Sequence, residues 1–340
     1  TAAISGYSLK EKFGVDTVIR PMEKASNFIG DVIRINGALE TIQLDDITII
    51  RIKCPAGAEV LNTPFRYLYM IIDLNVAVLT VTREDKTFRL QMDDVLLEGD
   101  EVYLAVHRNH QNEALKSFGY DQSAKQRLLL ISGSKRWSPL IKSIKESGID
   151  VSVFEESLEQ AERTSLDFPD ITTISGDYLD YDLLKDTSSG IDVALVSTDR
   201  KENNVLLSLF LKKIGVKRIL TLINDNRYKE LLNECSVIDP DFITAESVVN
   251  RILPRKSMYI SELGNGDFCI MAAEVAESCN KIGHSFSSTG IEGTVFPIFI
   301  SKNGAINPSS SKITVGDHVL LLAEKKSVNN LKRSFSCHSY

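Results

Sequence analysis

The sequence predicts a protein of the α/β class, with a doubly wound parallel sheet flanked by two small α+β modules. Short apolar runs alternate with amphipathic segments between residues 127 and 223, which is the pattern of consecutive β-α-β units. A different pattern, of strands, a short helix and a charged or glycine-containing turn, occurs in residues 45–119 and again in residues 260–336. The chain has 340 residues, 43% of them hydrophobic. At ~150 residues per domain it has room for roughly two to three domains.

Each strand of the expected parallel sheet is a short apolar run that ends in small or acidic residues. The runs are 128–131, 151–155, 172–177, 193–197 and 218–223. The helices expected between them are 139–147, 156–165, 179–186 and 202–214. Gly148 and Gly215 follow two of these segments, as glycine commonly does at a helix end. Because parallel sheets bind ligands at the carboxyl ends of their strands, the segments after the strands are the candidate site.

An internal repeat relates the two small modules. Residues 99–106 (GDEVYLAV) resemble residues 316–323 (GDHVLLLA), and a polar, helix-like tail follows each. A second match lies upstream, where residues 18–21 (VIRP) resemble residues 237–240 (VIDP). Apolar residues then recur at i, i+4 and i+8, on one face of a helix. They are Ala25, Ile29 and Ile33 in one copy and Ala245, Val249 and Leu253 in the other.

We interpret these matches as a tandem duplication whose first copy is truncated. The second copy holds ~90 residues that have no counterpart before Thr1, and residue 1 is Thr rather than Met. The expected domains are listed from the amino terminus. They are the tail of a first parallel-sheet domain (1–40), a first small module (45–119), a complete parallel-sheet domain (126–254) and a second small module (258–338).

Composition excludes several classes of protein. The chain has 39 Lys and Arg against 46 Asp and Glu, a formal charge of −7, and no basic stripe, so nucleic acid and anionic lipid are poor partners. The apolar run at residues 67–81 is shorter than the ~20 residues of a membrane span. The cysteines are scattered and have no C-x-x-C spacing, which disfavours disulfide frameworks and zinc sites. They are Cys54, Cys235, Cys269, Cys279 and Cys337.

The first βα turn departs from the dinucleotide-binding fingerprint G-x-G-x-x-G. It reads Ser132-Gly133-Ser134-Lys135-Arg136-Trp137, with no glycine at the three fingerprint positions and Trp137 in place of the third. The following helix still offers amide donors for an anion, and Lys135 and Arg136 add positive charge. Two interpretations stay open, a retained nucleotide site and a degenerate structural loop.

Polar residues follow the next three strands. Glu155 lies ~20 residues past the turn, where an acid typically accepts hydrogen bonds from a ribose; a solvated glutamate is the alternative. Asp177 follows the third strand and is either a ligand contact or the cap of the next helix. Ser197, Thr198 and Asp199 follow the fourth strand.

No catalytic or metal-binding constellation is predicted. The sequence has no G-x-S-x-G elbow and no Walker loop. His107 and His110 stand in a polar tail without a cluster of further ligands, so a solvated face is the better interpretation. We therefore expect a non-enzymatic protein. The alternatives are an NAD-dependent oxidoreductase, which the broken fingerprint and the two small modules oppose, and a structural protein that only oligomerises.

Three stretches carry a family resemblance. They are Gly176-Asp177-Tyr178-Leu179-Asp180, then Ser197-Thr198-Asp199 followed by Asn203, then Ile306-Asn307-Pro308 leading to Gly316-Asp317. With the order of elements, they make the chain similar to the TrkA family of cytosolic regulatory subunits of Trk potassium uptake. That family carries two Rossmann-like RCK (KTN) domains, each followed by a small RCK-C domain.

The resemblance implies that NAD(H), ATP or ADP binds the Rossmann-like domains and gates a membrane-embedded potassium transporter subunit. It also implies a homo-oligomer in the cytoplasm, held at the inner face of the plasma membrane by that protein partner, with no role for nucleic acid. The implied cofactor contacts are Ser132, Gly133, Ser134, Lys135, Glu155, Gly176, Asp177, Ser197, Thr198 and Asp199.

This sequence departs from the family pattern at three places. The turn after the first strand lacks its glycines, residues 221–225 (TLIND) lack the basic residue often found after the fifth strand, and Leu90 stands where the second module has Pro308. We therefore expect nucleotide binding in this copy to be weak or lost.

Overall fold

The structure is a computed structural model, and the chain in it divides into two compact units. One unit comprises residues 1–34 and 124–249, and the other comprises residues 35–123 and 250–340. The described residues are 14, 18–44, 46–72, 76–132, 135–228, 230–232, 235–252, 259–264, 266–275, 277, 279, 282–285, 295–302, 305–307 and 312–327. Within them, no helix is both long and apolar enough to cross a membrane.

The first unit is built on a parallel sheet in the order β11-β10-β9-β6-β7-β8. Its strands are β6 (Arg127–Ser132), β7 (Asp150–Glu155), β8 (Thr172–Ser175), β9 (Val193–Ser197), β10 (Arg218–Leu222) and β11 (Ser236–Ile238). The five expected strands are therefore present, and all pairings between neighbours are parallel. The sixth, β11, was not predicted, because its three residues are too few to stand out as an apolar run.

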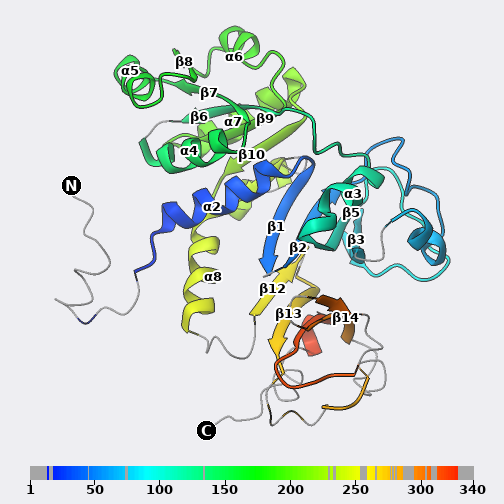
Figure 1. The fold of residues 1–340 in the computed structure, drawn as a ribbon. Helices are drawn as coiled ribbons and strands as arrows, with labels where there is room; N and C mark the ends of the chain where they lie inside the picture. Colours follow the sequence, from blue (N-terminus) through cyan, green and yellow to red (C-terminus); the bar gives the residue numbers. More distant parts are fainter. Residues whose placement is uncertain are drawn as a thin grey trace. The chain divides into compact units, whose positions relative to one another are not determined.

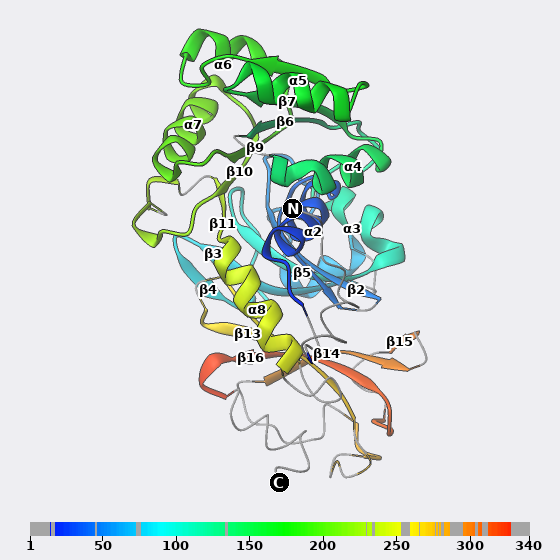
Figure 2. The same cartoon turned by 90° about the vertical axis from the view of Figure 1, so that its left-hand side faces the viewer.

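Helices cover both faces of this sheet (Figures 1 and 2). The crossover helices are α4 (Ser138–Glu146), α5 (Leu158–Asp167), α6 (Tyr181–Thr187) and α7 (Lys201–Ile214). Leu128 and Leu130 of β6 join the core under α4, whereas Leu129 and Ile131 join the core under α6 and α7. The alternation follows from the period of two along a strand and explains why the parallel strands are apolar throughout. Short 3-10 turns, η4 (Asn226–Tyr228) and η5 (Glu230–Leu232), follow β10.

A helix from the amino-terminal segment packs on this sheet's outer layer. Helix α2 (Pro21–Arg34) buries Ile29 and Ile33 in the same core as Leu140 and Ile144 of α4, and both views show the two helices side by side. Arg34 Nε donates to Ser147 Oγ at 2.9 Å. Helix α8 (Pro240–Ile252) is the counterpart of α2 in the repeat, and its Ile243 belongs to the same core.

The second unit contains two antiparallel sheets of identical strand order. The first runs β1-β2-β5-β3-β4 and the second β12-β13-β16-β14-β15. The first sheet comprises β1 (Ala38–Leu44), β2 (Ile47–Lys53), β3 (Val76–Arg83), β4 (Lys86–Phe88) and β5 (Glu101–His107). The second comprises β12 (Tyr259–Leu263), β13 (Phe268–Glu274), β14 (Val295–Lys302), β15 (Ala305–Asn307) and β16 (His318–Glu324). The first sheet is covered by η1 (Phe65–Met70) and α3 (Gln111–Ser117); η2 (Arg108–His110) precedes α3, and η7 (Lys325–Ser327) follows β16.

The repeat in the sequence corresponds to a repeat in structural detail. The register shifts between Val78 and Thr80 in β3 and between Pro297 and Phe299 in β14. The two shifts lie opposite equivalent residues of β5 and β16. A β-bulge at the same place in both sheets is the mark of one fold present twice.

The Gly-Asp pair that begins each repeat match makes a specific turn. Gly99 and Gly316 have φ of 86° and 80°, a left-handed conformation that favours glycine. The buried Asp100 carboxylate accepts from the Leu97 N–H at 2.8 Å, and Asp317 accepts from the Thr314 N–H at 2.7 Å. The motif therefore encodes a turn into the central strand of each sheet.

The two sheets pack against each other through an apolar cluster. Ile49 and Tyr103 of the first sheet meet Ile270 and Leu322 of the second in this cluster. Strand β1 crosses the domain boundary expected between residues 40 and 45. It pairs with β2 along its length.

Candidate functional site

The carboxyl ends of β6, β7, β8 and β9 bring the expected site residues to one edge of the parallel sheet. Ser132 is in register with Glu155 on one side and with Ser197 on the other. The strand order reverses between β6 and β9, the switch point where open α/β sheets bind ligands. Gly133 and Ser134 lie outside the described residues. Lys135 is the first residue of η3 (Lys135–Trp137), but the structure does not describe its side chain.

Trp137 closes the switch point. Its side chain is 1% exposed and packs in the core with Leu130 and Leu140. The indole Nε1–H donates to Ser197 Oγ at 3.1 Å. The third fingerprint glycine lets a helix and a dinucleotide approach the strand closely. A buried indole takes up the corresponding space in this protein.

Glu155 is buried beneath this turn, at 3% exposure. It lines a cavity of about 10 Å³ together with Ser132, Trp137, Thr164 and Asp167, which is room for about one water molecule. Burial raises the pKa of Glu155 to about 7, despite a hydrogen bond from Thr164 that lowers it, and the charge of Asp199 raises it further. Its Oε2 has no hydrogen-bond partner among the described residues. The carboxyl is thus turned into the core, and the predicted alternative of a solvated glutamate is wrong.

Three cations near this edge, Arg136, Lys201 and Arg227, are paired with carboxylates of the chain. Arg136 Nη2 lies 2.5 Å from Asp199 Oδ1. Beyond β10, Asp225 accepts two hydrogen bonds from the Arg227 guanidinium, at 2.9 and 2.6 Å. Lys201 Nζ lies 2.9 Å from the same carboxylate. Hydrogen bonds from Arg227 and then from Lys201 hold the pKa of Asp225 well below its ordinary value.

This cluster was not predicted from the sequence. Residues 221–225 contain no basic residue, but Arg227 stands two positions later and folds back onto Asp225. The signal available was the spacing Asp-x-Arg directly after an apolar strand. Neither Lys201 nor Arg227 was among the expected contacts.

Thr198 faces the fold and not the open edge. Its N–H donates to Asn204 Oδ1 at 2.8 Å, and its hydroxyl lies 2.7 Å from the same oxygen. Asn204 Nδ2 in turn donates to the Leu222 carbonyl at 2.9 Å. All three links are buried and join the ends of β9 and β10. The residue that makes them is Asn204, whereas the sequence analysis pointed to Asn203.

Gly176 and Asp177 shape the turn after β8. A Cβ at Gly176 would lie 2.6 Å from Leu183 Cδ2, so any larger residue there would displace the Leu183 side chain. Asp177 accepts from the Leu179 N–H at 2.8 Å. The cap of α6 is Asp180, which accepts from the N–H groups of Asp182 and Leu183. Of the two alternatives for Asp177, the one in which it caps this helix is therefore wrong.

This edge does not fit a dinucleotide in the usual mode. An indole stands where the third glycine would be, the cavity beneath it is water-sized, and the acid that would meet a ribose is buried. Arg136, Lys201 and Arg227 are paired with acids. Groups of three or more His, Cys, Asp or Glu suited to a metal ion are absent from the described part of the chain.

The chain is similar to known proteins over most of its length. Residues 134–243 match the TrkA-N domain family. The Trk system potassium uptake protein TrkA of Vibrio alginolyticus is 22% identical over 343 residues, which cover 94% of this chain and 73% of that protein. TrkA of Azorhizobium caulinodans is 21% identical, over 96% of this chain and 74% of that protein. A TrkA homolog 1 of Methanosarcina mazei is 30% identical over 179 residues, 52% of this chain and 44% of that protein.

Solved structures share the fold. The crystal structure of the GsuK RCK domain matches with a TM-score of 0.51 and 13% identity, over 95% of this chain and 71% of that one. The GsuK channel bound to NAD matches with a TM-score of 0.50 and 12% identity, over 93% of this chain and 58% of that one. The expected α/β class, with a parallel sheet and antiparallel modules, is confirmed.

Proposed function

We propose that this chain, which matches the TrkA-N domain family at residues 134–243 and is similar to TrkA proteins over most of its length, acts as a regulatory, gating subunit of a Trk-type potassium uptake system. The proposal rests first on the extent of the similarity, since the TrkA proteins align with more than nine-tenths of the chain. In this role the chain works in the cytoplasm, as a homo-oligomer docked on a membrane-embedded transporter subunit. The proposal includes the four domains expected from the sequence, at residues 1–40, 45–119, 126–254 and 258–338.

We propose further that the Rossmann-like unit of residues 126–254 has given up nucleotide binding in the usual mode. The observation that supports this is the indole of Trp137, buried at the switch point and hydrogen-bonded to Ser197. The ligand contacts expected at Glu155 and Thr198 are buried within the fold. The unit then acts as a rigid part of the assembly. Any nucleotide would act by favouring one arrangement of domains through a different site.

An enzymatic role has less support. A hydride transfer needs a nicotinamide held at the switch point and an acid or base beside it. The described residues at this edge offer a water-sized cavity and paired ions. We therefore do not propose an NAD-dependent oxidoreductase, and the experiment below includes the result that would establish one.

Two measurements on this chain test the proposal. Co-expression with the potassium transporter subunit of its own genome should yield a complex, and potassium uptake should differ with and without the chain. Isothermal calorimetry with NADH, ATP and ADP should give no tight binding to the Rossmann-like unit. Failure to associate and to change uptake would overturn the regulatory role. Tight NADH binding with hydride transfer to any acceptor would establish the enzyme instead.

A further inference from the structure

The outer edge of the parallel sheet is a second feature, which the proposed function does not use. Strand β8 is last in the sheet order and pairs, among the described residues, only with β7. The Gly176 N–H bonds to the Glu155 carbonyl of β7. In a parallel strand, alternate residues direct both backbone groups to the same side. Thr173 and Ser175 therefore present their N–H and C=O groups to the open edge.

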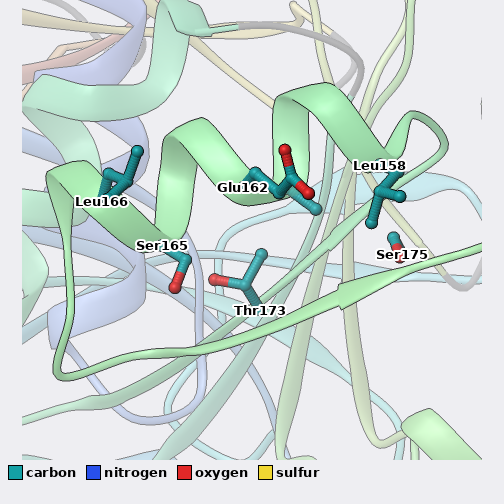
Figure 3. A pocket seen from close by; sticks show the side chains of 7 residues that line it. Leu158, Glu162, Ser165, Leu166, Thr173 and Ser175 are labelled. Carbon is teal, nitrogen blue, oxygen red and sulfur yellow. The ribbon is translucent and has the colours of Figure 1, made fainter.

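A groove of about 520 Å³ runs between this strand and helix α5 (Figure 3). It is lined by Leu158, Ala161, Glu162, Ser165, Leu166, Thr173 and Ser175. Leu158 and Leu166 are 64% and 81% exposed, a large exposure for two leucines on one helix. Burial of an exposed leucine side chain is favourable, so this groove offers uncovered apolar surface.

The strand side of the groove is polar and only partly satisfied. Ser165 and Thr173 point toward one another across it in Figure 3. The Thr173 hydroxyl is buried and has no hydrogen-bond partner among the described residues. The same strand thus supplies a free backbone edge and a buried hydroxyl without a partner, beside two exposed leucines.

The surroundings of the groove are strongly acidic. Residues 156–180 contain a single basic residue, Arg163, which pairs with Glu159. From outside this stretch, Lys145 of α4 pairs with Asp170 at 3.2 Å. The acidic residues in this stretch are all exposed. They are Glu156, Glu159, Glu162, Asp167, Asp170, Asp177 and Asp180. Asp167 and Asp170 precede β8 and Asp177 and Asp180 follow it, so carboxylates stand at both ends of a neutral edge.

We propose that the groove between α5 and β8 binds an extended segment of another protein, which adds to β8 as a strand. The segment has small apolar side chains at alternate positions and Lys or Arg on both sides. Strand addition satisfies the backbone of Thr173 and Ser175, and the apolar side chains cover Leu158 and Leu166. The basic ends meet the carboxylates on either side of β8.

The spacing of the leucines suits such a segment. Leu158 and Leu166 are eight residues apart on a helix, a distance of about 12 Å along its axis. Residues four apart on an extended chain are about 13 Å apart and face the same side. A single peptide can therefore contact both leucines without bending. The proposal does not depend on the potassium role, because it uses neither the switch point nor the small modules.

A labelled peptide of sequence KKVTVTVTVKK tests the proposal on the full chain. We expect saturable binding by fluorescence anisotropy, which weakens as salt is raised. Binding should protect the amides of Thr173 and Ser175 from hydrogen exchange. The double variant Leu158→Ser with Leu166→Ser should weaken binding at least tenfold. Both leucines are exposed, so the fold should tolerate the change. Leu231→Ser, at another exposed leucine, is the matched control and should bind as the unmodified chain does.

Several results would overturn the proposal. Equal binding by the double variant would remove the groove from the interaction, and equal binding of the acidic peptide EEVTVTVTVEE would remove the charge argument. Protection of Thr173 and Ser175 without peptide, at a concentration where sedimentation shows a dimer, would assign the edge to a second copy of the chain. A change in potassium uptake alone would not test binding at the groove. The proposed gating role and the proposed binding at β8 can therefore fail independently.

Discussion

The indole Nε1–H of Trp137 donates a hydrogen bond to the hydroxyl of Ser197 at 3.1 Å, across the switch point of the parallel sheet. Trp137 ends the turn after β6, and Ser197 ends β9. The bond thus spans the two strands between which an open α/β sheet usually receives its ligand. A position that commonly serves a dinucleotide has become part of the core.

Removing the acceptor of this bond should destabilise the Rossmann-like unit. Ser197→Ala leaves the buried indole N–H without a partner, which costs about 1–3 kcal/mol. Trp137 is the only tryptophan in the chain, so its fluorescence reports on this unit during urea unfolding. Ser175→Ala, at an exposed serine that ends β8, is the control and should unfold like the unmodified chain. Identical midpoints for Ser197→Ala and the control would contradict the structural role of the bond.

The buried Glu155 should make stability depend on pH. Its pKa is about 7 in the folded chain and about 4.3 when unfolded. The folded chain therefore binds more protons between these values, and the free energy of unfolding should fall as pH rises from about 4 to about 7, by on the order of 3 kcal/mol. Glu155→Gln should flatten this slope and be the more stable protein at pH 8.

The fluorescence of Trp137 can follow this transition, because both side chains line the same cavity. Glu162→Gln, which changes an exposed acid, should keep the slope of the unmodified chain. If Glu155→Gln kept it as well, the carboxyl would not be the titrating group.

Releasing the cations at the carboxyl edge should favour anions there. Asp225→Asn removes the carboxylate that holds Lys201 and Arg227. The loss of this negative charge makes the net charge of the edge more positive by one. We expect the affinity for ATP, measured by calorimetry at low salt, to rise above that of the unmodified chain and to fall again at high salt. Asp186→Asn makes the same change of charge on an exposed residue of α6 and should have no effect. Unchanged affinity in Asp225→Asn would show that ion pairing does not limit binding.

The contact between the two small sheets should depend on Tyr103. Its buried hydroxyl donates to Glu40 Oε2 at 2.7 Å and accepts from the Gly264 N–H at 3.0 Å. Tyr103→Phe leaves the Gly264 N–H without its acceptor and leaves Glu40 with Arg51 alone, at 3.5 Å. It should cost about 1–3 kcal/mol, seen as faster hydrogen exchange at Gly264. The unfolding transition reported by Trp137 should stay unchanged. Tyr69→Phe, at a tyrosine that is 57% exposed, is the control. Equal hydrogen exchange at Gly264 in both variants would show that the Tyr103 hydroxyl does not stabilise the contact between the two sheets.

The strands that were predicted share one property, a local pattern that suffices to define them. The run 193–197 coincides with β9, and the expected helix 202–214 differs from α7 by one residue at its start. Elements that depend on a partner were missed or misplaced. Strand β11 has three residues and becomes a strand by pairing with β10. The expected helix 156–165 lies two residues later, as α5.

The candidate site shows the same division. The broken fingerprint at residues 132–137 and the acid at position 155 are visible in the sequence, as is their place at strand ends. The paired state of Asp225 and the identity of Asn204 as the buried link depend on residues about 20 positions away. A pattern of residue types carries no information on which oxygen a given donor reaches.

The sequence by itself determined the α/β class, the repeat of the small module, the similarity to TrkA proteins and the absence of the three fingerprint glycines. These follow from periodicity and from residues close together along the chain. Only the tertiary structure decided that Trp137 fills the switch point, that Glu155 is buried with a raised pKa, and that the edge of β8 lies open beside two exposed leucines. Burial, pKa and an open edge are set by neighbours distant in sequence, because solvent exclusion is a property of the packed chain.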